Sequence, residues 1–87
     1  ALSIAVAASV ARRYFAILAL RRRIAIAREN SAAITAILDV IRVRVKVGVA
    51  SSLDLAREQA QVEGVQAQLS TLEVEERRAV FALAVLV

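Results

Sequence analysis

Hydrophobic residues recur along both halves of the chain at alternating steps of three and four positions, interrupted by the polar residues Arg13, Ser31, Glu58 and Glu76. In the first half they are Val10, Ile17, Leu20, Ile24, Ala27, Ile34, Leu38, Ile41 and Val45. In the second half they are Leu55, Val62, Val65, Leu69, Leu72, Ala79, Leu83 and Leu86. Such spacing places the side chains on one stripe of an α-helix. The pattern therefore predicts two long helices, each with one apolar seam.

Between the two seams, helix stop and start signals follow in the expected order. Gly48 can adopt the positive φ that ends a helix. Ser51 and Asp54, three residues apart, fit a capping box that would hold the start of the next helix. Residues 1–87 are thus predicted to form a single helical hairpin, with a helix over about 2–46, a turn over about 47–52 and a helix over about 53–86.

The two arms carry opposite charge, which favours antiparallel pairing. Residues 1–47 hold nine basic and two acidic side chains, for a net +7, whereas residues 48–87 have a net charge of −3. A turn centred near residue 49 would bring an acidic cluster opposite an arginine triplet. The predicted inter-helix charge pairing involves Arg21, Arg22, Arg23, Glu73, Glu75 and Glu76. Exposed pairs contribute only about 0 to 1 kcal/mol each, so they set register more than stability.

One segment allows an alternative. From Ile41 to Val49, apolar residues alternate strictly with Arg, Lys or Gly, which is the period of a half-buried strand. Valine also has a low helix propensity. Continuity with the preceding seam and the lack of a convincing partner strand favour a helix here.

More apolar residues are present than two paired helices can cover. Ile26, Ala33, Ile37, Val40 and Val47 form a second apolar row beside the first seam. Neighbouring hairpins, a membrane surface or aggregation could cover this row. The fold class expected is all-α: a long antiparallel two-helix coiled-coil hairpin that assembles as a homo-oligomer into a larger helical bundle or α-barrel.

The composition offers little for catalysis. The chain is 60% hydrophobic and only 3% aromatic, and it contains no His and no Cys. Glu73, Glu75 and Glu76 could form a metal or acid–base cluster, but a solvated face opposite arginines explains them better. A slender hairpin also lacks the sheltered pocket in which acid–base groups are tuned. We expect no enzyme activity, no catalytic residues, no cofactor and no metal.

Six of the eight arginines in the first arm raise the question of polyanion binding: Arg12, Arg13, Arg21, Arg22, Arg23 and Arg28. Nucleic acid is not expected, because only Tyr14 and Phe15 are available there for stacking and the acidic second arm offsets the charge. Binding to a membrane surface stays open, since arginines beside aliphatic faces suit anionic headgroups. No apolar run reaches the roughly 20 residues of a spanning helix. Position 1 is not Met and no signal-peptide pattern is present, so we expect a fragment, a processed product or an engineered chain.

Several segments carry a resemblance to a known family. Residues 10–20, VARRYFAILAL, resemble the start of the first long helix in TolC- and OprM-like outer-membrane efflux proteins, and residues 24–30, IAIAREN, continue it. Residues 43–55, VRVKVGVASSLDL, resemble the periplasmic tip and the opening of the returning helix. Residues 82–87 are similar to the end of that helix. The Gly-Val-Ala-Ser-x-Leu-Asp tip is the most specific part, and the first hairpin repeat fits best.

The resemblance implies the periplasmic portion of an outer-membrane protein. In such a trimeric channel the helices form the tunnel wall, and hairpin tips dock onto the periplasmic adaptor of an efflux pump. Carried over by position, Val47, Gly48 and Val49 would be the adaptor-contact tip, and Ser51 and Asp54 would cap the helix behind it. The alternative is a self-assembling hairpin, excised or engineered, with no transport activity of its own.

Overall fold

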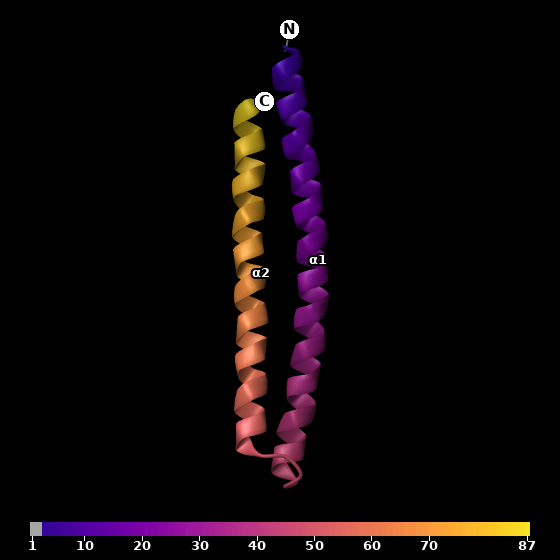
Figure 1. Cartoon of the computed structure of the whole chain (residues 1–87), viewed down its shortest axis with the longest axis vertical. Helices are drawn as coiled ribbons and strands as arrows, with labels where there is room; N and C mark the ends of the chain where they lie inside the picture. The colour runs from indigo at the N-terminus through magenta and orange to yellow at the C-terminus, as the bar shows by residue number, and fades with distance from the viewer. Residues whose placement is uncertain (1–2) are drawn as a thin grey trace.

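Two antiparallel helices joined by a short turn make up the computed structural model, which describes residues 3–87 (Figure 1). Helix α1 spans Ile4–Lys46 and helix α2 spans Ser52–Leu86. The hairpin measures 70 × 14 × 13 Å. The N-terminal end of α1 extends beyond the C-terminal end of α2 (Figure 1). This arrangement confirms the predicted antiparallel hairpin.

Local signals fix where each helix starts. The Ser3 side chain caps α1 by accepting a hydrogen bond from the backbone N–H of Val6, with an N–O distance of 3.1 Å. Ser51 caps α2 in a complete capping box. Each cap satisfies a backbone donor that a helix start leaves without an intrahelical partner. Long helices are consistent with the Ala, Leu and Arg content of the arms, because these residues have high helix propensity.

The core of the hairpin is a thin aliphatic line between α1 and α2. Its buried members within residues 3–87 are Ile17, Ile24, Leu38, Val62 and Leu72. All five belong to the predicted seams, and the other seam residues are half-buried. Five buried side chains are few for the 85 residues from 3 to 87, because in this part of the chain each helix packs against a single other helix.

The alternating segment is helical rather than extended. Residues 41–46 complete α1, and no strand occurs within residues 3–87. Ile41 and Val45 are half-buried on the seam, whereas Val43 is exposed. A helix keeps Ile41 and Val45 in the inter-helix contact, so packing outweighs the low helix propensity of valine.

Candidate functional site: the hairpin tip and lateral faces

The tip closes α1 with a tight hydrogen-bonded turn. Val47 is the C-cap residue of α1, and Gly48 follows it with a φ of 81°. The backbone N–H of Val49 donates to the carbonyl of Arg44 at 2.9 Å, and that of Gly48 donates to the carbonyl of Val45 at 3.1 Å. These two bonds form a Schellman motif with glycine in the left-handed position. The motif satisfies the last carbonyls of α1.

The second half of the tip is the capping box at the start of α2. The Ser51 Oγ accepts a hydrogen bond from the backbone N–H of Asp54 at 3.2 Å, and the Ser51 N–H donates to the Asp54 carboxylate at 3.1 Å. The Ser51 hydroxyl also lies 3.0 Å from the same carboxylate oxygen. Hydrogen bonding from the Ser51 backbone, then from its side chain, lowers the pKa of Asp54. The carboxylate thus stays charged at the positive end of α2.

Two valines flank the turn and face solvent. Val47 is 67% exposed and Val49 is 71% exposed. Exposed apolar side chains at a tip held by hydrogen bonds on both sides form a small, fixed apolar surface. A groove of about 440 Å³ begins beside this surface. Its lining residues are Ile41, Arg44, Val49, Ala50, Asp54, Arg57, Glu58 and Gln61.

One lateral face of the hairpin carries the inter-helix ion pairs. Arg21 and Glu76 approach to 3.8 Å, and Arg28 and Glu73 also approach to 3.8 Å. The arginine side chains are more than half exposed, so solvent screens both pairs. The structure therefore brings together one pair from the predicted set and joins Glu73 to an arginine outside it.

The other members of the predicted charge set differ from Arg21, Glu73 and Glu76 in their surroundings. Within residues 3–87, Arg22, Arg23 and Glu75 have no oppositely charged partner within 4.0 Å. Sequence reasoning missed Arg28. The heptad spacing could have indicated that Arg28 pairs with an acidic residue of α2, because Arg21 and Arg28 are seven residues apart and share one face of α1.

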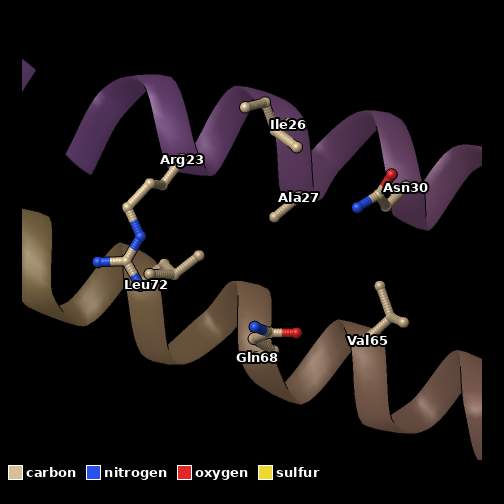
Figure 2. Close-up of a pocket in the computed structure, with 7 residues that line it drawn as sticks. All are labelled: Arg23, Ile26, Ala27, Asn30, Val65, Gln68 and Leu72. Carbon is tan, nitrogen blue, oxygen red and sulfur yellow. The ribbon is translucent and has the colours of Figure 1, made fainter. Parts of the chain in front are cut away.

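Another surface feature is a groove of about 220 Å³ between the helices (Figure 2). Figure 2 shows the Arg23 side chain extending from α1 toward Leu72 on α2, while Val65 points back toward α1. Ile26, the first member of the second apolar row, also lines this groove. The row remains uncovered along α1: Ile26, Ile37, Val40 and Val47 are 48–67% exposed.

The polar side chains of the described residues lie at the surface of the hairpin. Residues 3–87 contain no buried polar or charged side chain and no group of three or more His, Cys, Asp or Glu placed to hold a metal ion. In the same residues, neither helix has a stretch of the length and hydrophobicity required to cross a membrane. The features that remain are an apolar tip, an uncovered apolar row and a charged face.

A long two-helix rod with this tip is the geometry expected from the family resemblance, and comparison with known families matches residues 1–87 to Outer membrane efflux protein. The chain belongs to the outer membrane efflux protein family. This family consists of transport-channel components and is not a family of enzymes. Searches of curated proteins and of solved structures found no match. The hairpin of this outer membrane efflux protein is thus part of a transport-channel component.

Proposed function

We propose that the hairpin forms part of the periplasmic tunnel wall of an outer-membrane efflux channel and that its tip docks onto a periplasmic adaptor protein. The family match over residues 1–87 supports the channel role. The single observation that carries the docking role is the turn: Val47 and Val49 are 67% and 71% exposed. They flank a backbone fixed by the Schellman motif and the capping box.

In this proposal Val47, Gly48 and Val49 supply the contact surface. Gly48 has no side chain and therefore leaves room for a partner's backbone to approach. The valines supply apolar contact at the centre of a small interface, where desolvated side chains contribute most of the binding energy. Ser51 and Asp54 hold the turn without contacting the adaptor. The tunnel wall is built when neighbouring hairpins in a trimer cover the second apolar row.

The docking role is tested by Val49→Asp, measured as binding of the purified chain to a panel of periplasmic adaptor proteins. A charge in a desolvated contact is expected to abolish binding, while circular dichroism shows unchanged helicity. Val85→Asp is the matched control, because Val85 is also 71% exposed but lies at the other end of the hairpin. Equal binding by Val49→Asp and the unsubstituted chain would defeat the assignment of the tip.

A second candidate function is self-assembly without transport. The uncovered row on α1 favours it, because four large aliphatic side chains on one helix face remain about half exposed or more. A monomeric soluble protein rarely leaves so continuous an apolar stripe in water. In this case the hairpins would pair through the row and the tip would bind no adaptor.

A further inference from the structure

The end of the hairpin opposite the turn, called here the open end, carries all three aromatic residues of the chain. Tyr14 and Phe15 on α1 are 51% and 66% exposed, and Phe81 on α2 is 72% exposed. The rings of Tyr14 and Phe15 meet edge to face, with centroids 5.7 Å apart. Because Glu76 contacts Arg21, Phe81 lies five residues farther along α2, at about the level of Tyr14 and Phe15.

Next to the aromatic residues, on the side toward the turn, lies a cluster of arginines that we call the arginine belt. Its members are Arg21, Arg22, Arg23, Arg77 and Arg78. The Arg21–Glu76 ion pair places the two helices' contributions at the same level. In the described chain, Arg21 is the belt member with a carboxylate within 4.0 Å. The belt thus presents guanidinium groups that are free to bind another anion.

Charge and apolar surface are both concentrated at the open end. Residues 3–28 and 73–87 hold eight basic and three acidic side chains, for a net +5, whereas residues 29–72 have a net charge of −1. Beyond the belt, residues 3–20 and 79–87 contain only two charged residues, Arg12 and Arg13. Apolar side chains in this region are widely exposed, including Ile4 at 90% and Val85 at 71%. The hairpin is therefore amphipathic along its length.

We propose that the open end binds the headgroup region of an anionic lipid bilayer. Aromatic side chains favour the interface between hydrocarbon and water, where Tyr14, Phe15 and Phe81 would sit. Arginine stems lie along apolar surface while their guanidinium groups reach phosphate. The belt therefore contacts lipid phosphates when the aliphatic end enters the interface.

Charge selects a lipid surface over a second copy of the chain as the occupant. Two open ends that met end to end, each with a net charge of +5, would repel each other, whereas an anionic bilayer attracts them. The turn end also exposes valines, but residues 39–58 there hold four basic and three acidic side chains, for a net charge of only +1, and Arg42 pairs with Asp39 at 3.2 Å. Lipid binding is thus confined to one end. It goes beyond adaptor docking, which uses the opposite end, so either one can fail without the other.

The experiment uses Tyr14 as its reporter, because the chain has one Tyr and no Trp. The chain is mixed with phosphatidylglycerol vesicles that carry spin-labelled acyl chains, and Tyr fluorescence is recorded. We expect quenching that about 0.5 M NaCl largely reverses, since salt screens surface attraction. Phosphatidylcholine vesicles with the same label are expected to quench little. A chain with Tyr14→Phe and Val49→Tyr moves the reporter to the turn and is expected to show no quenching.

Paired variants separate a located site from general charge. Arg77→Gln with Arg78→Gln is expected to lower the vesicle partition coefficient by about 30-fold, from the typical contribution of two basic residues at an anionic surface. Arg44→Gln with Lys46→Gln removes the same charge near the turn and is expected to change it less than about threefold. Phe81→Ser is expected to weaken binding, whereas Leu53→Ser, 28 residues earlier on the same helix face, is not.

Three outcomes would overturn the proposal. One is the absence of Tyr14 quenching by phosphatidylglycerol vesicles. Another is an equal loss of partition in the two double charge variants, which would indicate net charge rather than a site. The third is protection of Tyr14 from aqueous iodide that rises with chain concentration in the absence of lipid, because a second copy would then cover the open end.

Discussion

At the scale of single residues, the two glycines of the chain play opposite parts. Gly48 has a φ of 81°, a backbone conformation that is strained for a residue with a Cβ. This holds although a Cβ at Gly48 would have open space around it, beyond its two chain neighbours. Gly64 sits inside α2 and also has open space around it. The first glycine makes the turn possible, whereas the second weakens a helix, because glycine loses more backbone entropy on folding than alanine does.

Alanine substitutions at the two glycines are therefore expected to have opposite signs. Gly48→Ala should lower the free energy of unfolding by about 1–2 kcal/mol, the cost of a left-handed non-glycine residue. Gly64→Ala should raise it by about 0.5–1 kcal/mol. Urea denaturation followed by circular dichroism measures both. A stabilising Gly48→Ala would contradict the left-handed turn.

Asp54 makes the start of α2 sensitive to acid. Its pKa in the folded chain lies below the ordinary value of 3.8, chiefly because the Ser51 backbone donates to the carboxylate. The contribution to stability is therefore present above pH 3.8 and is lost as the pH falls through the folded pKa. Asp54→Asn should remove this part of the acid dependence, measured as thermal unfolding between about pH 2 and 6. If the unfolding temperatures of the unsubstituted chain and of Asp54→Asn changed with pH in parallel, Asp54 would not be the source of the acid sensitivity.

Local signals at the turn were readable from the sequence, and individual ion pairs were not. Gly48, Ser51 and Asp54 act within a few residues of one another, so their order along the chain contains the geometry. Which arginine meets Glu73 depends instead on the orientation of two helices about their axes. Three consecutive arginines point in three directions, and only Arg21 shares the face of Arg28.

At the scale of the helix, the seam determined the structure of the one ambiguous segment. The alternation from Ile41 onward would suit a strand, but a strand needs a second strand to pair with. As a helix, the same segment packs against α2. Ile41 and Val45 lie half-buried on the same stripe as Leu38. Heptad spacing over the whole of α1 was thus a better guide than a pattern of nine residues.

The seam also predicts which isoleucines stabilise the hairpin. Ile24 is 2% exposed, whereas Ile26, two residues later, is 48% exposed. Ile24→Ala should lower the free energy of unfolding by about 2–5 kcal/mol, through lost burial and a residual cavity. Ile26→Ala should change it by less than about 1 kcal/mol in dilute, monomeric chain. Similar losses from both substitutions would mean that the seam is misplaced.

At the scale of the whole molecule, the hairpin has much surface and little core. Within residues 3–87, five hydrophobic side chains are buried in a rod 70 Å long, while the second apolar row faces solvent. The sequence predicted this excess from its apolar content, because two helices can cover only one stripe each. It could not predict what covers the row, since the covering surface lies outside the hairpin.

Charges placed in the row are expected to disrupt association of the chain. Ile37→Asp with Val40→Asp should shift sedimentation-velocity profiles toward the monomer, because two carboxylates cannot enter an apolar contact without desolvation. Val43→Asp with Glu29→Gln keeps the same net charge as the unsubstituted chain and alters positions outside the row. This control should sediment as the unsubstituted chain does. Equal effects of the two variants would exclude the row as the contact.

The closed turn has a consequence for how fast and how tightly a partner can engage it. The backbone N–H groups of Gly48 and Val49 donate to carbonyls of α1, and Ser51 and Asp54 hydrogen-bond to each other. The loop is therefore already ordered before a partner binds. A partner that binds it need not supply the entropy cost of organising that segment. Binding at this tip would then join two already ordered surfaces, without a disorder-to-order transition of the loop. Substitutions at the tip should therefore act mainly on the dissociation rate.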